Sequence, residues 1–286
     1  MKEIVRYLFI ILISFLNIIL LFNYSSYEVT SEKYIKNSIE ENTNIIDIVY
    51  SKKFNKNKTI IKVRKKVDKI VSIGKLINKE DIIKQDILNS TISKQIVSTM
   101  AINIVNSIRD NKYYSLYELD DYYYLLDNNI DNIIESANIP LLYNFKSNIL
   151  DILKDLGEDI IKDIPSTYKI TKRIPNYKYN IMHYVINYNN RKILISIDII
   201  LLILLIILYR NKIINNLIII LIISIIFTFI IQIYLLTISN SYINEWSFIK
   251  IMFKDYINKT VTLNIFMIII LIIISSYKVI KNKKAS

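Results

Sequence analysis

Residues 217–237 read LIIILIISIIFTFIIQIYLLT, a run without a charged residue and with apolar side chains on every face of a helix. A helix needs about 20 such residues to cross the hydrocarbon core of a bilayer. Residues 7–22, 193–209 and 260–277 form three further apolar runs. Helices in the core of soluble proteins keep a polar stripe, which we do not find in these runs. The sequence therefore predicts an all-α membrane protein with four transmembrane helices.

The first apolar run is predicted to remain in the protein as a signal anchor. A short basic tip precedes it, as in a secretory signal peptide. The residues that follow the run, NYSSY at 23–27, offer no small-x-small cleavage site. We therefore expect the first run to be a permanent transmembrane helix.

Basic residues beside the apolar runs predict the orientation in the membrane. They lie at the N-terminal tip, in the loop between the second and third runs, and in the C-terminal tail: Lys2, Arg6, Arg210, Lys212, Lys278, Lys281, Lys283 and Lys284. The positive-inside rule places both termini in the cytosol. The predicted parts are residues 1–23 (N-terminal tip and first helix), 24–191 (an extracytoplasmic helical domain) and 192–286 (the other three helices and a basic tail). Heavy use of isoleucine, asparagine and lysine is typical of AT-rich genomes, so we expect a bacterial cell membrane.

Composition excludes several kinds of chemistry. Cys 0 rules out disulfides and thiolate zinc sites, and His 1 rules out a multi-histidine metal site. Gly 2 makes a glycine-rich nucleotide loop improbable. The net charge of +12 resides mostly in the membrane flanks, so we expect no nucleic-acid partner. The sequence predicts a non-enzymatic protein with no catalytic residues, cofactor or metal.

The extracytoplasmic segment carries several helical patterns. Apolar residues at steps of three and four predict helices over residues 142–164, 92–108 and 119–134, and a weaker one over 31–41. Residues 59–73 fit either a helix or a strand, and we favour a helix because no hairpin turn follows. Residues 165–190 are predicted to be an irregular, tyrosine-rich connection.

A basic surface is the first candidate binding site. Its members are Lys62, Arg64, Lys65, Lys66 and Lys69. Residues 113–145 contain acids but no lysine or arginine. The two stretches either neutralise each other or stay as separate solvated faces, or the basic one binds an anionic polymer, lipid headgroup or acidic partner.

Polar residues inside the apolar runs form the second candidate site. Each run contains one in its outer half: Asn17, Asp198, Gln232 and Asn264. Polar side chains in a bilayer form hydrogen bonds between helices. We predict that these four meet inside the bundle around Asp198. They would serve as a helix-packing clamp or, alternatively, as a proton or substrate relay.

The resulting functional prediction is an envelope protein whose outer domain binds membrane lipid, an anionic envelope polymer, a protein partner or a second copy of the chain. The order of one span, a large outer segment and three spans resembles the permease subunits of mechanotransmitting ABC transport systems. That resemblance in topology implies a transport or signal-transmitting subunit working with an ATPase. A membrane-embedded enzyme acting on lipid is a third alternative, which would need His183 or Asp198.

Overall fold

A computed structural model describes residues 2–51, 58–74, 88–136, 144, 146–163, 166–242 and 247–283. Within these ranges the chain forms helices and turns and no β-strand. It divides into two compact units. Unit 1 consists of Met1–Thr30, Ile181–Glu245 and Ile249–Ser286, and unit 2 consists of Ser31–Asn180 and Trp246–Phe248.

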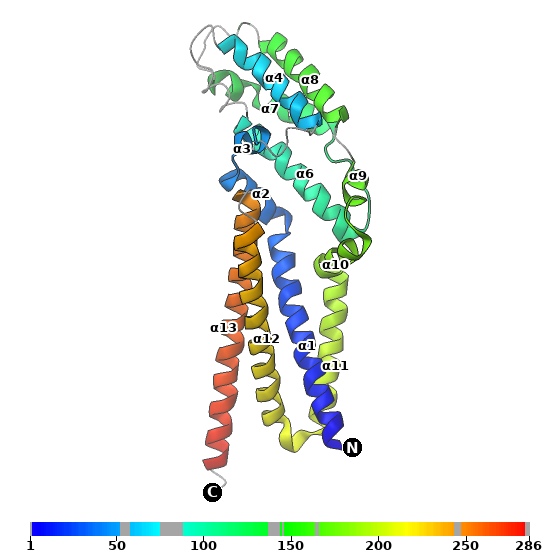
Figure 1. Cartoon of the computed structure of the whole chain (residues 1–286), viewed down its shortest axis with the longest axis vertical. Coiled ribbons are helices and arrows are strands. Elements are labelled where there is room, and N and C mark those ends of the chain that lie inside the picture. Colours follow the sequence, from blue (N-terminus) through cyan, green and yellow to red (C-terminus); the bar gives the residue numbers. More distant parts are fainter. Residues whose placement is uncertain are drawn as a thin grey trace. The chain divides into compact units, whose positions relative to one another are not determined.

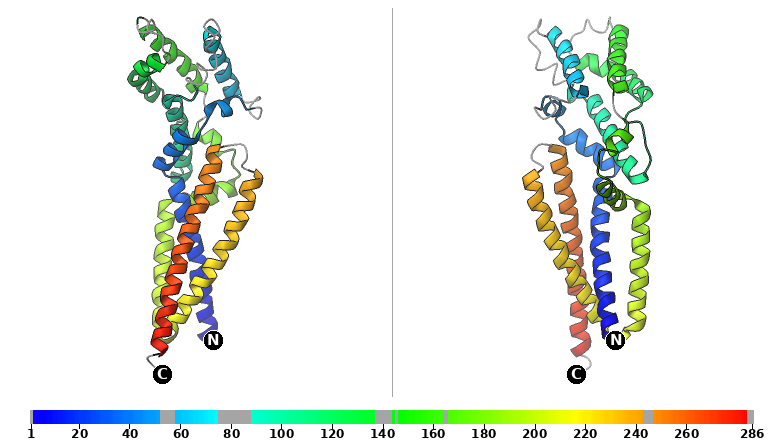
Figure 2. Two further views of the ribbon diagram at one scale, coloured as in Figure 1. Left: turned by 90° about the vertical axis from the view of Figure 1, so that its left-hand side faces the viewer. Right: turned by 45° about the vertical axis from the view of Figure 1, so that its right-hand side comes forward.

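Unit 1 is a bundle of long helices. Its members are α1 (Lys2–Val29), α11 (Tyr188–Leu208), α12 (Ile213–Tyr242) and α13 (Ser247–Lys283). A short 3-10 turn, η4 (Arg210–Lys212), joins α11 to α12. The chain direction alternates from one helix to the next, so the start of α1 and the end of α13 lie at the same end of the bundle (Figures 1 and 2).

Three helical segments are long and apolar enough to cross a membrane: Lys2–Val29, Arg210–Thr237 and Ile251–Lys281. All three are longer than the apolar runs that predicted them. The helix α11 is not among them, because it has only 21 residues and any 18-residue stretch of it includes Arg191, Lys192 and Asp198. Length and composition therefore support a multi-pass membrane protein with three candidate spans, and they do not confirm the fourth span that we predicted.

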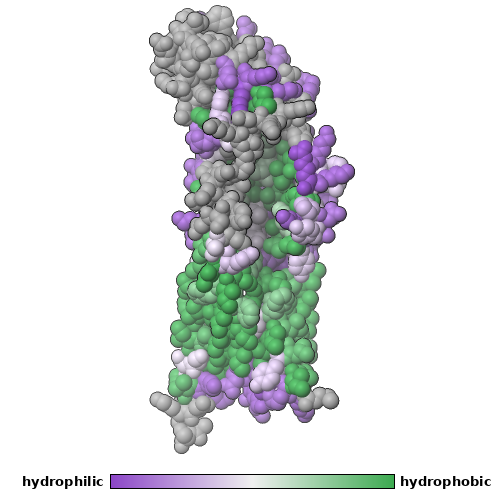
Figure 3. All heavy atoms as spheres, viewed as in Figure 1, coloured by the Kyte–Doolittle hydropathy of each residue, from purple (hydrophilic) through white to green (hydrophobic). Residues whose placement is uncertain are grey.

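The lateral surface of the bundle is apolar. Figure 3 shows hydrophobic side chains along its helices and hydrophilic ones at the end where α1 begins. The helix α11 shares this surface, since Ile193, Ile200 and Ile207 are each more than half exposed. Soluble proteins rarely expose apolar patches of this extent. The surface suits a lipid environment.

Isoleucine and leucine side chains from three helices fill the centre of the bundle. Ile10 and Ile13 of α1, Leu205 of α11 and Ile220 of α12 form one buried cluster. Two small residues, Ser14 of α1 and Ser224 of α12, lie close together in the same interior. The Ser224 hydroxyl donates a hydrogen bond to the backbone oxygen of Ser14 over 3.3 Å. Helices in membranes approach closely where residues are small.

Unit 2 contains mostly shorter helices. They are α2 (Glu32–Asn42), α3 (Ile45–Val49), α4 (Lys58–Gly74), α6 (Thr91–Asp110), α7 (Leu119–Ser136), α8 (Lys146–Asp163) and α9 (Thr167–Thr171), followed by α10 (Asn176–Ile186), which runs into unit 1. The helices predicted over residues 31–41, 92–108 and 119–134 are confirmed as α2, α6 and α7. The ambiguous segment 59–73 is helical, as α4.

Hydroxyl groups begin two of these helices. The side chain of Ser31 accepts a hydrogen bond from the Tyr34 N–H, and that of Ser90 accepts one from the Ser93 N–H. Such N-caps satisfy backbone donors that have no partner within the helix. Polar residues placed just before an amphipathic pattern therefore fix where α2 and α6 begin.

One prediction for this part of the chain is wrong. Residues 165–190 are not an irregular connection, because α9, α10 and the start of α11 lie there. Pro175 directly precedes α10, where a proline is compatible with the start of a helix. Residues 138–143 and 164–165, on which the predicted limits of the 142–164 helix depended, lie outside the described residues, and α8 begins at Lys146.

Tyrosines pack the contact between α7 and α8. Tyr117, Tyr122 and Leu126 form a buried cluster with side chains of α6 and α8. The Tyr122 hydroxyl donates a hydrogen bond to the backbone oxygen of Leu153 over 2.8 Å. Its ring lies against Gly157, at the place where a larger residue would carry a side chain.

Because of these buried tyrosines, we expect unit 2 to lose stability in strong alkali. Burial raises the pKa of Tyr122 to about 12, and burial, followed by the Asp121 carboxylate, raises the pKa of Tyr117 to about 12. Unfolded tyrosine titrates near ~10. The unfolded chain therefore loses these protons at a lower pH than the folded chain does. The free energy of unfolding keeps its full value below pH ~10 and decreases as the pH rises towards the pKa of the folded state. Urea midpoints of unit 2 in the full chain should decrease over this range, and Tyr122→Phe should flatten the decrease.

Candidate functional site

A stripe of buried polar residues winds along α12. Asn216, Ser224, Thr228 and Gln232 follow one another at multiples of four residues, and each is at most 2% exposed. Residues four apart lie on the same face of a helix. Other faces of α12 expose Phe227 and other apolar side chains. The polar residues therefore face the interior of the bundle.

Two other helices contribute polar groups to this interior. The Asn264 Nδ2 of α13 donates a hydrogen bond to the Gln232 Oε1 over 3.3 Å. From α1, the Ser14 hydroxyl donates to the backbone oxygen of its own helix at Ile10 over 2.7 Å. Ser14 also approaches the Ile220 backbone oxygen of α12 at 3.4 Å. The stripe therefore links α12 to both α1 and α13.

The structure brings together part of the predicted intramembrane cluster. Gln232 and Asn264 are hydrogen-bonded to each other. Asp198 is buried, and its Oδ1 has no hydrogen-bond partner. Asn17 is only half-buried. In the described part of unit 1, no hydrogen bond joins Asn17 or Asp198 to the Gln232–Asn264 pair.

Sequence reasoning missed most of the buried polar side chains. Those in unit 1 that it did not single out are Ser14, Asn23, Ser25, Asn216, Ser224, Thr228 and Thr260. Serine and threonine satisfy their hydroxyls with backbone oxygens inside an apolar run, so they give a weak signal. The four-residue spacing on α12 was the pattern that could have revealed them.

Several buried polar atoms of unit 1 have no hydrogen-bond partner. They are Arg6 Nε, Asn23 Oδ1, Asp198 Oδ1, Asn216 Nδ2 and Oδ1, Gln232 Nε2 and Asn264 Oδ1. An unpaired polar group in a lipid environment costs several kcal/mol. The interior of the bundle therefore offers hydrogen-bonding capacity that its own side chains leave unused.

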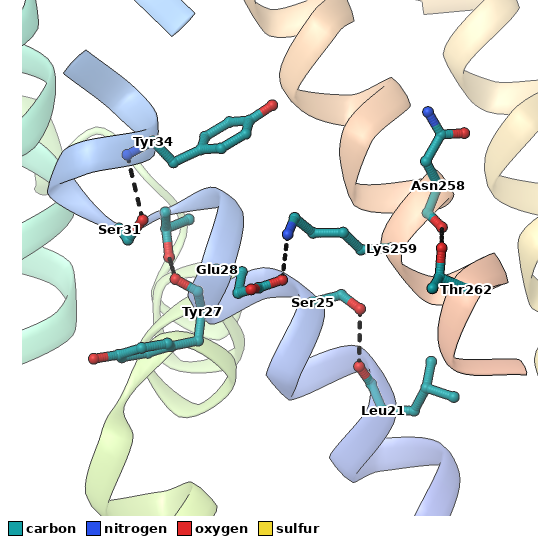
Figure 4. Close-up of polar contacts among 10 residues, drawn as sticks. Leu21, Ser25, Tyr27, Glu28, Ser31, Tyr34, Asn258, Lys259 and Thr262 are labelled. Carbon is teal, nitrogen blue, oxygen red and sulfur yellow. Dashed lines mark hydrogen bonds and ion pairs between the residues drawn. The ribbon is translucent and has the colours of Figure 1, made fainter. Parts of the chain in front are cut away.

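Ion pairs lie towards both ends of the bundle. Where α1 begins, Glu3 contacts Arg6 at 2.6 Å and Lys212 at 2.6 Å. Towards the other end of α1, Glu28 pairs with Lys259 of α13 (Figure 4). Each acid ties α1 to another part of unit 1.

A cluster of tyrosines surrounds one arginine at the start of α11. The Arg191 Cζ lies 4.4 Å from the ring centroid of Tyr27, 4.7 Å from that of Tyr188 and 5.8 Å from that of Tyr24. The Lys192 Nζ lies 4.5 Å from the Tyr188 centroid. We name these five residues the arginine–tyrosine cluster. Sequence reasoning did not identify it, because the rings come from two distant segments.

The predicted basic surface divides into two parts on α4. Lys62 and Lys65 are exposed and Lys66 is half-buried, whereas the side chain of Lys69 lies outside the described residues. The side chain of Arg64 lies against the end of α3 and the residues after it, where its guanidinium donates hydrogen bonds to the backbone oxygens of Val49 and Ser51.

Arg64 is therefore a structural residue that fixes the chain after α3. Its Cζ lies 5.8 Å from the ring centroid of Tyr50, whose hydroxyl donates to the Asp68 carboxylate over 2.6 Å. Burial and this carboxylate raise the pKa of Tyr50. Because its donors are occupied within unit 2, we remove Arg64 from the candidate binding surface.

Part of the acidic stretch pairs within unit 2. Asp131 contacts Lys146 at 2.6 Å, and Asp127 contacts Lys154 at 2.8 Å, so α8 neutralises two of the acids of α7. His183 lies half-buried in α10. Among the described residues, no group of three His, Asp or Glu side chains could hold a metal ion.

Comparison with known proteins adds no relative. The chain matches no protein-family model, no curated protein and no solved structure.

Proposed function

We propose that this protein spans a bacterial cell membrane four times and that unit 2 is an extracytoplasmic domain that binds an anionic envelope polymer. The fourth span is α11. Its charges Arg191 and Lys192 are its fourth and fifth residues, which leaves Asp198 as the one charge in the apolar run, and Asp198 is buried. The alternating direction of the helices agrees with an even number of passes (Figure 1).

The orientation follows from the basic residues of unit 1. Lys2 and Arg6 of α1 lie at the same end as Lys212, to which Glu3 is bonded. The end of α13, with Lys278 and Lys281, lies at that end as well (Figure 1). A basic flank marks the cytosolic side. Unit 2, which follows α1, is then outside.

The exposed lysine face of α4 carries the binding proposal. Val67 is buried in a core with Ile45, Val49 and Leu88, and Val63 packs against it. Lys62 and Lys65 are exposed on the same helix. The helix α4 therefore uses its apolar side for folding and exposes lysines on another side.

Lysines suit a polymer of repeated negative charges. A lysine ammonium is a compact point charge without a fixed hydrogen-bonding fork, so it tolerates many positions of a phosphate or carboxylate. Attraction between exposed charges weakens as salt shortens the Debye length to about 8 Å at physiological ionic strength. Binding to a polyanion should therefore depend steeply on salt.

The experiment uses the full chain in nanodiscs of neutral lipid, with polyphosphate as the probe. We expect Lys62→Gln with Lys65→Gln to weaken binding about three- to tenfold, on the scale of ~1 kcal/mol lost for the pair. The control, Lys169→Gln with Lys172→Gln, removes the same charge from exposed positions in and beside α9 and should bind nearly as the wild type does. Binding that ignores salt, or equal loss in both variants, would contradict the proposal.

Topology is tested separately, in intact cells. The chain has Cys 0, so a single introduced cysteine reports its own side of the membrane. In intact cells, a membrane-impermeant maleimide should label Lys65→Cys and leave Lys281→Cys unlabelled. The reverse pattern would place unit 2 in the cytosol.

A second candidate function is a transport or signal-transmitting subunit. The observation that favours it is the set of unpaired polar atoms in the bundle, because such atoms can bind water or a polar solute. If the lysine variants bind polymer as the wild type does, this candidate becomes the better supported one.

A further inference from the structure

The arginine–tyrosine cluster contains two cations without an acidic partner among the described residues. In the part of the chain that the structure describes, neither Arg191 nor Lys192 forms an ion pair. Glu28, in the same part of α1, is paired with Lys259. Asp198 lies two turns further along α11. Among the described residues, the positive charge of the cluster is therefore unpaired, and an anion could bind to it.

The location of the cluster makes this charge unusual. Arg191 and Lys192 lie at the start of α11, which is the end of the bundle opposite to the basic flank with Lys2 and Lys212 (Figures 1 and 2). The positive-inside rule disfavours cations on that side.

The geometry leaves the arginine ready to bind an anion. Tyrosine rings contact the guanidinium as cation–π partners. Such contacts hold the cation in place without using its N–H groups as a carboxylate would. The planar fork of the guanidinium then matches two oxygens of a phosphate. Tyr24 and Tyr188 are 43% and 42% exposed, as expected for rings at the headgroup level.

The neighbouring surface indicates which phosphate is bound. Directly after Lys192, α11 exposes Ile193, Ile197 and Ile200. Acyl chains can lie along these side chains while the headgroup stays beside the cations. A polymer without acyl chains would make no use of this apolar surface.

We propose that the arginine–tyrosine cluster binds the phosphate of an anionic phospholipid in the outer leaflet. Arg191 contacts two phosphate oxygens, Lys192 adds a second positive charge, and the three tyrosines hold the arginine. This inference rests on the proposed placement of α11 as a membrane span.

The experiment measures which lipid stays with the purified full chain. The protein is exchanged into a mixture of equal amounts of phosphatidylglycerol and phosphatidylcholine, and the lipids that remain bound are quantified by mass spectrometry. We expect the wild type to enrich phosphatidylglycerol roughly tenfold and Arg191→Gln with Lys192→Gln to lose most of this enrichment. Arg191→Lys should keep part of it, because the charge remains but the fork is lost.

The matched control is Lys278→Gln with Lys281→Gln, which removes two cations from the other end of the bundle. This variant should enrich phosphatidylglycerol nearly as strongly as the wild type does. No enrichment in the wild type, or an equal loss in the control, would overturn the proposal.

Two further arms separate the alternatives. If inorganic phosphate at millimolar concentration displaces the lipid completely, the cluster is a site for free phosphate and the lipid proposal fails. Polyphosphate binding by unit 2 is measured separately in neutral lipid, so failure of the polymer proposal leaves the lipid result readable. Maleimide labelling that contradicts the four-span topology would identify a failure of the placement of α11 itself.

Discussion

Gly157→Ala is expected to destabilise unit 2, although the same change stabilises a helix at an open position by about 1 kcal/mol. A methyl group at Gly157 would overlap the ring of Tyr122. The ring cannot move aside easily, because it is 8% exposed and its hydroxyl is bonded to Leu153. Overpacking of this kind costs about 1–3 kcal/mol. Hydrogen exchange of the α7 and α8 amides in the full chain should report the loss.

Two variants make this result interpretable. Ser147→Ala, at an exposed position of α8, should leave exchange nearly unchanged. Tyr122→Leu should be less harmful together with Gly157→Ala than the sum of the two single changes, because the smaller side chain removes the overlap. A stabilising effect of Gly157→Ala alone would mean that Tyr122 does not lie against this glycine.

Ser224→Leu should separate α1 from α12. The Ser224 hydroxyl reaches the backbone of Ser14, so little space lies between the two helices. A leucine adds volume where both residues are at most 1% exposed and also removes a hydrogen bond. We expect a loss of about 1–3 kcal/mol, measured as a lower midpoint of thermal aggregation in detergent.

Ser196→Leu is the control for hydrophobicity. Ser196 is exposed on α11 and bonds only within its own helix, to the Lys192 backbone oxygen over 3.0 Å. The same substitution there adds an apolar side chain to the lateral surface and should cost little. Equal effects of the two substitutions would show that α1 and α12 are not packed closely at Ser224.

Local patterns were sufficient to predict many of the helices. The apolar run at residues 217–237 lies within α12, and the three-and-four spacing at residues 92–108 lies within α6. Both signals act within a few turns of chain, where burial of one face or of all faces decides the conformation. The tyrosine-rich segment 165–190 misled the prediction, because its helices α9 and α10 have no long apolar stripe.

The candidate sites were predicted less completely, because their members interact across the fold. Nothing in the basic stretch distinguishes Arg64 from Lys65, and only the packing against Val49 and Ser51 removes Arg64 from the surface. The bond between Gln232 and Asn264 depends on the register of α12 against α13. The arginine–tyrosine cluster needs α1 and α11 side by side, which no local pattern encodes.

The sequence by itself determined that the chain is helical and that apolar segments carry it into a membrane. These properties follow from hydropathy and periodicity, which each segment expresses alone. Only the tertiary structure decided which polar side chains share the bundle interior, which cations stay accessible and which glycine must remain a glycine. Those outcomes depend on contacts between residues far apart in sequence, such as Arg191 with Tyr27 and Gly157 with Tyr122.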